Sequence, residues 1–174
     1  MPSMSKPVSF GQMRRYWGIG FAMCFLLPFY AAWVAEPEGT IDPTVHVMLW
    51  IIVVASLVVL PWLGKRERRK AYRKAEFATV EEVSSFRFAP SVRRFVDADR
   101  VRDELFAHAS SGYAITLKGA LEPLVVAVAL AAWHAPSYEW LLVCAMSLVA
   151  MLLVYPRRQD FLAEVADTYD VQLD

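Results

Sequence analysis

One carboxylate, Glu122, lies where an acidic side chain is costly, at the start of the apolar run Leu121 to Trp133. An ionisable group at membrane depth is by default a candidate for function, such as a carboxylate that couples transport to proton movement. Lys118 precedes it by four residues, a spacing that places both side chains on one helix face and allows an ion pair. Lys118 and Glu122 are therefore the intramembrane polar candidates, as a structural pair or as a functional carboxylate beside a cation.

Two histidines, His46 and His134, lie at the ends of apolar runs. On facing helices they could ligate a haem or a metal ion. Histidines are also ordinary residues at a membrane interface, and no second pair exists at the other ends of these runs. We therefore expect no cofactor, and keep a haem-bearing redox subunit as the third alternative for function.

Seven cations crowd into ten residues directly after an apolar run. Such a cluster anchors the end of a membrane span, and it also attracts an anionic lipid leaflet or an acidic partner. No nucleic-acid-binding fold or stacking surface accompanies the charges, so nucleic acid is not an expected partner. The candidate lipid- or partner-binding residues are Lys65, Arg66, Arg68, Arg69, Lys70, Arg73 and Lys74.

Motifs that would indicate an enzyme are absent. There is no P-loop, dinucleotide fingerprint or zinc-protease motif in the sequence. Cys24 and Cys144 both lie inside apolar runs, so they are expected to be buried apolar residues rather than a disulfide. The segments between the runs lack the cysteine pairs of thiol-oxidising quinone enzymes, and the first run lacks the deep carboxylate of small multidrug exporters. We expect a protein that is not an enzyme.

Four apolar runs must position these residues. The chain has 174 residues, of which 57% are hydrophobic, above the ~45–50% of a soluble domain. Nineteen uncharged residues at ~1.5 Å each span about 28 Å, close to the ~30 Å hydrocarbon core of a bilayer. The sequence predicts an all-α polytopic membrane protein whose four transmembrane helices form two hairpins. The predicted spans are residues 16–34, 45–63, 119–134 and 138–155.

The charges fix the predicted orientation. All 18 Lys and Arg residues lie in the N-terminal arm, the segment 64–118 or the C-terminal tail, and the two short connections at the other ends of the spans hold none. By the positive-inside rule, both termini and the long central segment are cytoplasmic. The predicted location is a bacterial inner membrane.

The chain divides into three predicted regions: residues 1–63, residues 64–118, and residues 119–174 with an acidic tail. In the central region, a capping box from Thr79 to Glu82 predicts a helix near Val80. Residues 86–90 are expected to be extended, since they precede or include a proline. Asp97 or Asp99 should cap a helix that runs to about Ala109 and ends at residues 110–112. Its apolar face is Val101, Leu105, Phe106 and Ala109, and the tail carries a similar stripe of Phe161, Leu162, Val165, Ala166 and Tyr169.

Three functions remain open. The leading hypothesis is a non-catalytic inner-membrane subunit that acts as scaffold or anchor in a larger secretion, conjugation, transport or respiratory assembly. Its expected partners are other membrane subunits or further copies of itself, together with anionic lipids at the cytoplasmic face. The alternative is a small homo-oligomeric transporter or channel that uses Glu122, and the third is the haem-bearing subunit that uses His46 and His134.

Overall fold

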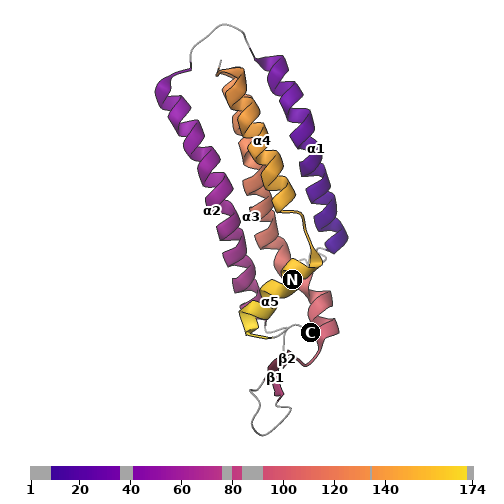
Figure 1. The fold of residues 1–174 in the computed structure, drawn as a ribbon. Coiled ribbons are helices and arrows are strands. Elements are labelled where there is room, and N and C mark those ends of the chain that lie inside the picture. Colours follow the sequence, from indigo (N-terminus) through magenta and orange to yellow (C-terminus); the bar gives the residue numbers. More distant parts are fainter. Residues whose placement is uncertain (1–8, 36–40, 76–79, 84–91, 134, 172–174) are drawn as a thin grey trace, which may run out of the picture.

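The computed structural model describes residues 9–35, 41–75, 80–83, 92–133 and 135–171. These residues form five helices and one two-stranded hairpin (Figure 1). In chain order the elements are α1 (Phe10–Val34), α2 (Pro43–Ala75), β1 (Val80–Val83), β2 (Val92–Phe95), α3 (Ala98–Ala132), α4 (Ser137–Leu153) and α5 (Arg158–Tyr169).

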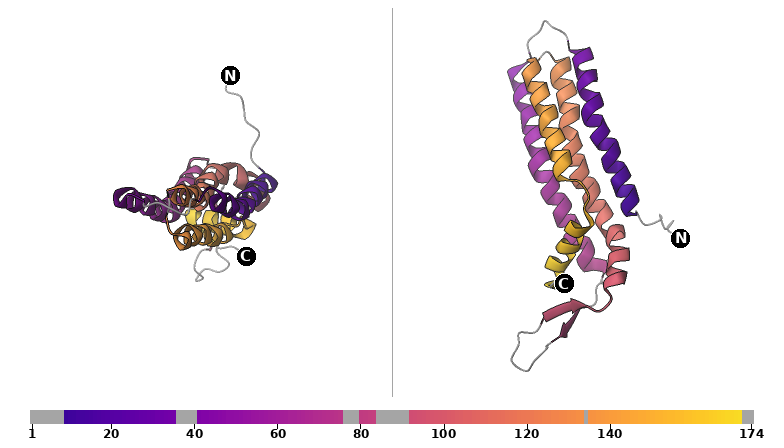
Figure 2. Two further views of the ribbon diagram at one scale, coloured as in Figure 1. Left: turned by 90° about the horizontal axis from the view of Figure 1, so that it is seen from above. Right: turned by 45° about the vertical axis from the view of Figure 1, so that its right-hand side comes forward.

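The first four helices form a bundle, with α3 packed against α1, α2 and α4 (Figures 1 and 2). The lower parts of α2 and α3 extend beyond α4, and α5 turns across them there. We call this end of the bundle, which carries α5 and the cationic part of α2, the basic end. The other end carries the start of α2 and the start of α4, and we call it the far end.

Three helices, α1, α2 and α3, contain stretches long and apolar enough to cross a membrane. The fourth, α4, has 17 residues, or about 25 Å. It is followed by α5 after a bend of 70°, and the number of possible crossings rises to four if that bent pair counts as one span. The prediction of a predominantly helical chain is confirmed, and three or four of its helices are long and apolar enough to cross a membrane.

Side-chain caps begin three of the helices. Ser9 and Gln12 form a capping box that starts α1 at Phe10, six residues before the predicted span. Asp42 accepts two backbone N–H bonds at the start of α2, and these bonds hold the pKa of its carboxyl group below the usual value. Asp97 accepts the backbone N–H of Arg100 at 3.0 Å, which confirms the predicted cap of α3.

The predicted helix near Val80 is wrong. Residues Val80–Val83 form β1, which pairs antiparallel with β2 in a register that places Glu81 opposite Arg94. Valine favours a strand, and pairing with β2 provides hydrogen-bond partners for the backbone of β1. These preferences outweigh the local capping-box signal. The extended segment predicted for residues 86–90 lies outside the described residues.

The predicted helix end at residues 110–112 is also wrong, because α3 continues through Gly112 without a break to Ala132. The reason is a close contact with α2. A Cβ placed on Gly112 would lie 2.4 Å from the carbonyl oxygen of Gly64, and one on Gly119 would lie 2.6 Å from that of Ser56. Glycine is needed at these positions for the two backbones to meet, so tertiary packing overrides its poor helix propensity. We call the contact along Ser56, Gly64, Gly112 and Gly119 the glycine seam.

The two predicted amphipathic stripes pack on each other at the basic end. The ring of Phe106 on α3 lies 6.0 Å from that of Phe161 on α5, nearly perpendicular to it, and Tyr113 lies 5.9 Å from Phe161. Leu105 on α3 and Val165 on α5 are fully buried. The two predicted apolar faces therefore cover each other within the chain itself.

Candidate functional site

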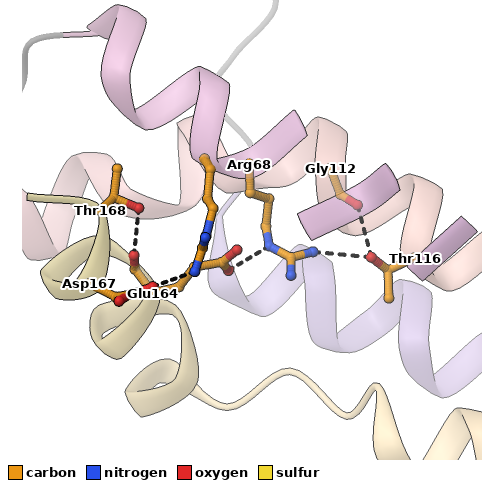
Figure 3. Close-up of polar contacts among 7 residues, drawn as sticks. Arg68, Gly112, Thr116, Glu164, Asp167 and Thr168 are labelled. Carbon is orange, nitrogen blue, oxygen red and sulfur yellow. Dashed lines mark hydrogen bonds and ion pairs between the residues drawn. The ribbon is translucent and has the colours of Figure 1, made fainter. Parts of the chain in front are cut away.

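The basic end holds a buried polar cluster. Arg68, on α2, donates through Nε to Glu164 Oε2 on α5 at 2.8 Å and through Nη1 to Thr116 Oγ1 on α3 at 3.1 Å (Figure 3). Only 12% of the Arg68 side chain and 9% of the Glu164 side chain are exposed. Thr116 in turn donates to the carbonyl oxygen of Gly112 at 3.1 Å. One arginine thus joins three helices, and it faces away from the surface where the sequence placed it.

Further bonds fasten α5 to α2. Arg69 pairs with Asp167, and the hydroxyl of Tyr169 donates to the backbone carbonyl of Tyr72 at 2.7 Å. The guanidinium of Arg68 also lies 5.7 Å from the centre of the Phe161 ring. Because α5 is held by ion pairs, a hydrogen bond and aromatic packing together, it forms an integral part of the bundle.

A small cavity of about 150 Å³ adjoins this cluster at the bend between α4 and α5. Arg68, Thr116, Asp160 and Glu164 contribute its polar lining. Glu164 Oε1 is buried and has no hydrogen-bond partner among the described residues. The cavity offers room for a few water molecules at roughly 30 Å³ each. Among its polar groups, Arg68, Thr116 and Glu164 bond α2 to α3 and α5.

Five other cations of the cluster lie at the surface of α2. They surround a hollow of about 370 Å³ together with Trp62. The guanidinium of Arg66 lies 5.5 Å from the centre of the Trp62 ring, a cation–π contact. The side chain of Lys74 lies outside the described part of the structure. The members of this cationic hollow are Trp62, Lys65, Arg66, Arg69, Lys70 and Arg73.

Lys118 and Glu122 line a large apolar groove between α1 and α3, with a volume of about 830 Å³. Lys118 is exposed and Glu122 is half-buried. No ion pair joins these two side chains or links either of them to another described residue. The groove also passes Gly20 on α1 and Ala114 on α3, two small residues that leave its walls open. We call this feature the α1–α3 groove.

At the far end, a hydrogen bond joins the His46 ring to the Glu139 carboxyl group of α4, which links α2 to α4. The indole Nε1 of Trp50 lies 3.3 Å from His46 Nε2 and 3.4 Å from Glu139 Oε2. The sequence paired His46 with His134, and His134 lies outside the described residues, so that haem or metal site stays a prediction. Across the described part of the chain, no group of three or more His, Cys, Asp or Glu side chains is placed to hold a metal ion.

Several residues of the buried cluster were missed from the sequence. Glu164 stands three positions after Phe161, so helical spacing places it beside that residue, at the edge of the apolar stripe of the tail helix. That spacing was the available signal that Glu164 is turned inward. Nothing local indicated Thr116, whose role depends on the side chain of Arg68, 48 residues away.

Comparisons with known proteins add no relatives. No family model matches the chain, and neither a curated protein nor a solved structure matches it.

Proposed function

We propose that this chain is a non-catalytic membrane subunit that scaffolds a larger assembly by receiving one transmembrane helix of a partner in the α1–α3 groove. The observation that carries the proposal is a groove of about 830 Å³ that holds Lys118 and Glu122 without an ion-pair partner among the described residues. In a lipid environment such groups are costly, and a partner helix with complementary polar side chains would lower that cost.

A helix suits the groove better than a globular domain. On α1 the groove runs from Met13 to Met23, about 15 Å along the axis or nearly three helical turns. Small residues let helix backbones approach closely in lipid, and the exposed Ala114 provides such a position on the α3 wall. The neighbouring cation and anion on α3 would fix the register of the incoming helix through its own charges.

The proposed setting is a bacterial inner membrane crossed four times, with both termini in the cytoplasm. It is supported by the charge distribution, because all 18 cationic residues lie outside the short connections at the far end. In this arrangement α5 and the lower parts of α2 and α3 form a rigid cytoplasmic platform. The groove then opens into the inner half of the bilayer.

Site-specific photo-crosslinking in intact cells tests the proposal. A photoreactive residue at Met23 or Ala114, both in the groove, should capture one defined membrane protein. Leu142 and Val149 are matched controls, because they are exposed apolar residues on α4, and there the probe should capture lipid only. Glu122→Lys should abolish capture at Met23 while the purified variant keeps its thermal stability. Lipid adducts alone at groove and control positions would overturn the proposal.

Glu122 also keeps the transporter alternative open, because the half-buried carboxylate lies in a groove that reaches toward the basic end. In that case the purified protein alone should carry a flux in liposomes, and Glu122→Gln should reduce it. If the native protein carries no flux, or if Glu122→Gln leaves the flux unchanged, this alternative falls.

A further inference from the structure

The cationic cluster on α2 has two separate roles in the structure. Arg68 points into the protein, toward Glu164 and Thr116. The cations at positions 65, 66, 69, 70 and 73 share the opposite face with Trp62 and enclose one hollow. Their spacing of three and four residues explains this, because it repeats along one face of a helix.

Trp62 marks the depth of the hollow. Its side chain is 58% exposed and ends the apolar part of α2. Tryptophan collects at the boundary between hydrocarbon and headgroups, so the hollow begins where lipid phosphates lie. The Arg66 guanidinium lies over the Trp62 ring, and the N–H groups at the guanidinium edges can still form bidentate bonds to phosphate oxygens.

Not all of the five cations are neutralised. Arg69 pairs with Asp167, and Lys70 pairs with Glu67. No acidic side chain among the described residues pairs with Lys65, Arg66 or Arg73. These three cations lie along nine residues of helix, so the first and the last are about 12 Å apart along the axis, a span that can accommodate two phosphate groups rather than one.

We propose that the cationic hollow is a specific site for the headgroup of an anionic lipid that carries two phosphodiesters, a lipid of the cardiolipin class. One phosphate binds between Lys65 and Arg66 beside Trp62, and the other binds at Arg73. The acyl chains lie along the apolar surface of α2 above Trp62. The site depends on α2 crossing a membrane, and it does not depend on what occupies the α1–α3 groove.

Native mass spectrometry of the delipidated full-length protein tests this site. The protein is titrated with a lipid bearing two phosphodiesters, an anionic lipid bearing one, a zwitterionic lipid and inorganic phosphate. We expect the protein to retain one molecule of the lipid with two phosphodiesters tightly and to bind the lipid with one phosphodiester more weakly. Little of the zwitterionic lipid or of inorganic phosphate should bind. An equal affinity for all the lipids, or capture of inorganic phosphate as strong as that of the lipid, would overturn the proposal.

A matched pair of triple variants separates a built site from diffuse attraction. The combination Lys65→Gln, Arg66→Gln and Arg73→Gln should weaken binding of the two-phosphodiester lipid by roughly a hundredfold, since each cation contributes about 1 kcal/mol near an anionic surface. The control removes three exposed cations outside the hollow, by Arg15→Gln, Arg157→Gln and Arg158→Gln, and should change binding less than threefold. Equal losses in the two triple variants would show that no specific site exists. Thermal unfolding of each variant without lipid verifies that both remain folded.

Discussion

The two flanks of α3 are built in opposite ways. On the side of α2, the backbones meet at the glycine seam, where a single added methyl group at Gly112 would clash with the Gly64 carbonyl. On the side of α1, the two helices leave between them a groove of about 830 Å³. Glycine is present on both flanks, but the nearest atoms to a Cβ added on Gly20 of α1 are the ends of the Leu121 and Met151 side chains.

The difference separates two uses of helix packing in one small protein. The glycine seam is filled completely by the chain, and Arg68 extends it beyond the apolar region by bonding α2 to Thr116 of α3 and to Glu164 of α5. The α1–α3 groove is open and includes two charged side chains. A seam of the first kind holds the fold together, whereas a surface of the second kind suits an interaction with another molecule.

The largest expected loss of stability follows substitution of Arg68, where the glycine seam ends. Arg68→Met leaves the Glu164 carboxylate buried without its cation, and breaking a buried pair in this way costs about 3–5 kcal/mol. Chemical unfolding in detergent should show this loss in the free energy of unfolding. The double variant Arg68→Met with Glu164→Leu should recover most of it, because no buried charge remains. If the double variant were as unstable as the single one, the buried pair would not be the cause.

A smaller effect is expected within the seam itself. Gly112→Ala places a Cβ 2.4 Å from the Gly64 carbonyl oxygen and 2.8 Å from the Arg68 backbone nitrogen. Since backbone atoms cannot move aside cheaply, the variant should lose about 1–3 kcal/mol of unfolding free energy. Gly18→Ala is the matched control, because nothing lies within 4 Å of its added Cβ. It should gain about 0.5–1 kcal/mol from helix propensity. Equal changes in unfolding free energy for Gly112→Ala and Gly18→Ala would contradict the idea that Gly112 is needed for close packing of α2 on α3.

The smallest effect is expected on the other flank. Gly20→Ala brings its Cβ within 3.0 Å of Leu121 Cδ1 and Met151 Cε. Both atoms end flexible side chains that can rotate away, and the gain in helix propensity offsets part of the cost, so the net change should stay below about 1 kcal/mol. The same unfolding measurement compares it directly with Gly112→Ala. A loss as large as that of Gly112→Ala would mean that α1 is packed as tightly as α2.

The pattern of apolar runs and caps was readable without a structure. The run after Pro43, the cap at Asp97 and the amphipathic stripe around Phe161 all lie in helices as predicted. Each of these signals is local, because hydropathy, side-chain capping and helical periodicity act within a few turns. The two local errors, at Val80 and at Gly112, occurred where a partner segment decided the outcome. At Val80 the deciding partner is β2, which pairs with β1. At Gly112 it is α2, which packs against α3.

The candidate sites were less predictable than the helices. The sequence identified Lys118 and Glu122 as polar residues at membrane depth, and the structure places both in one groove. The sequence analysis grouped Arg68 with the neighbouring cations of α2, although the Arg68 side chain is buried against α5. Its partner Glu164 is 96 residues away, and no local pattern connects residues at that separation.

By itself, the sequence determined that long apolar helices exist and where the cations gather, because these properties depend on residue type and short spacing. Only the tertiary structure decided which face of each helix is covered. In lipid an outward leucine is as favourable as an inward one, so hydropathy does not mark the buried face of a membrane helix. The closeness of α2 to α3, the open flank toward α1 and the inward turn of Arg68 therefore follow from shape and charge complementarity between distant segments.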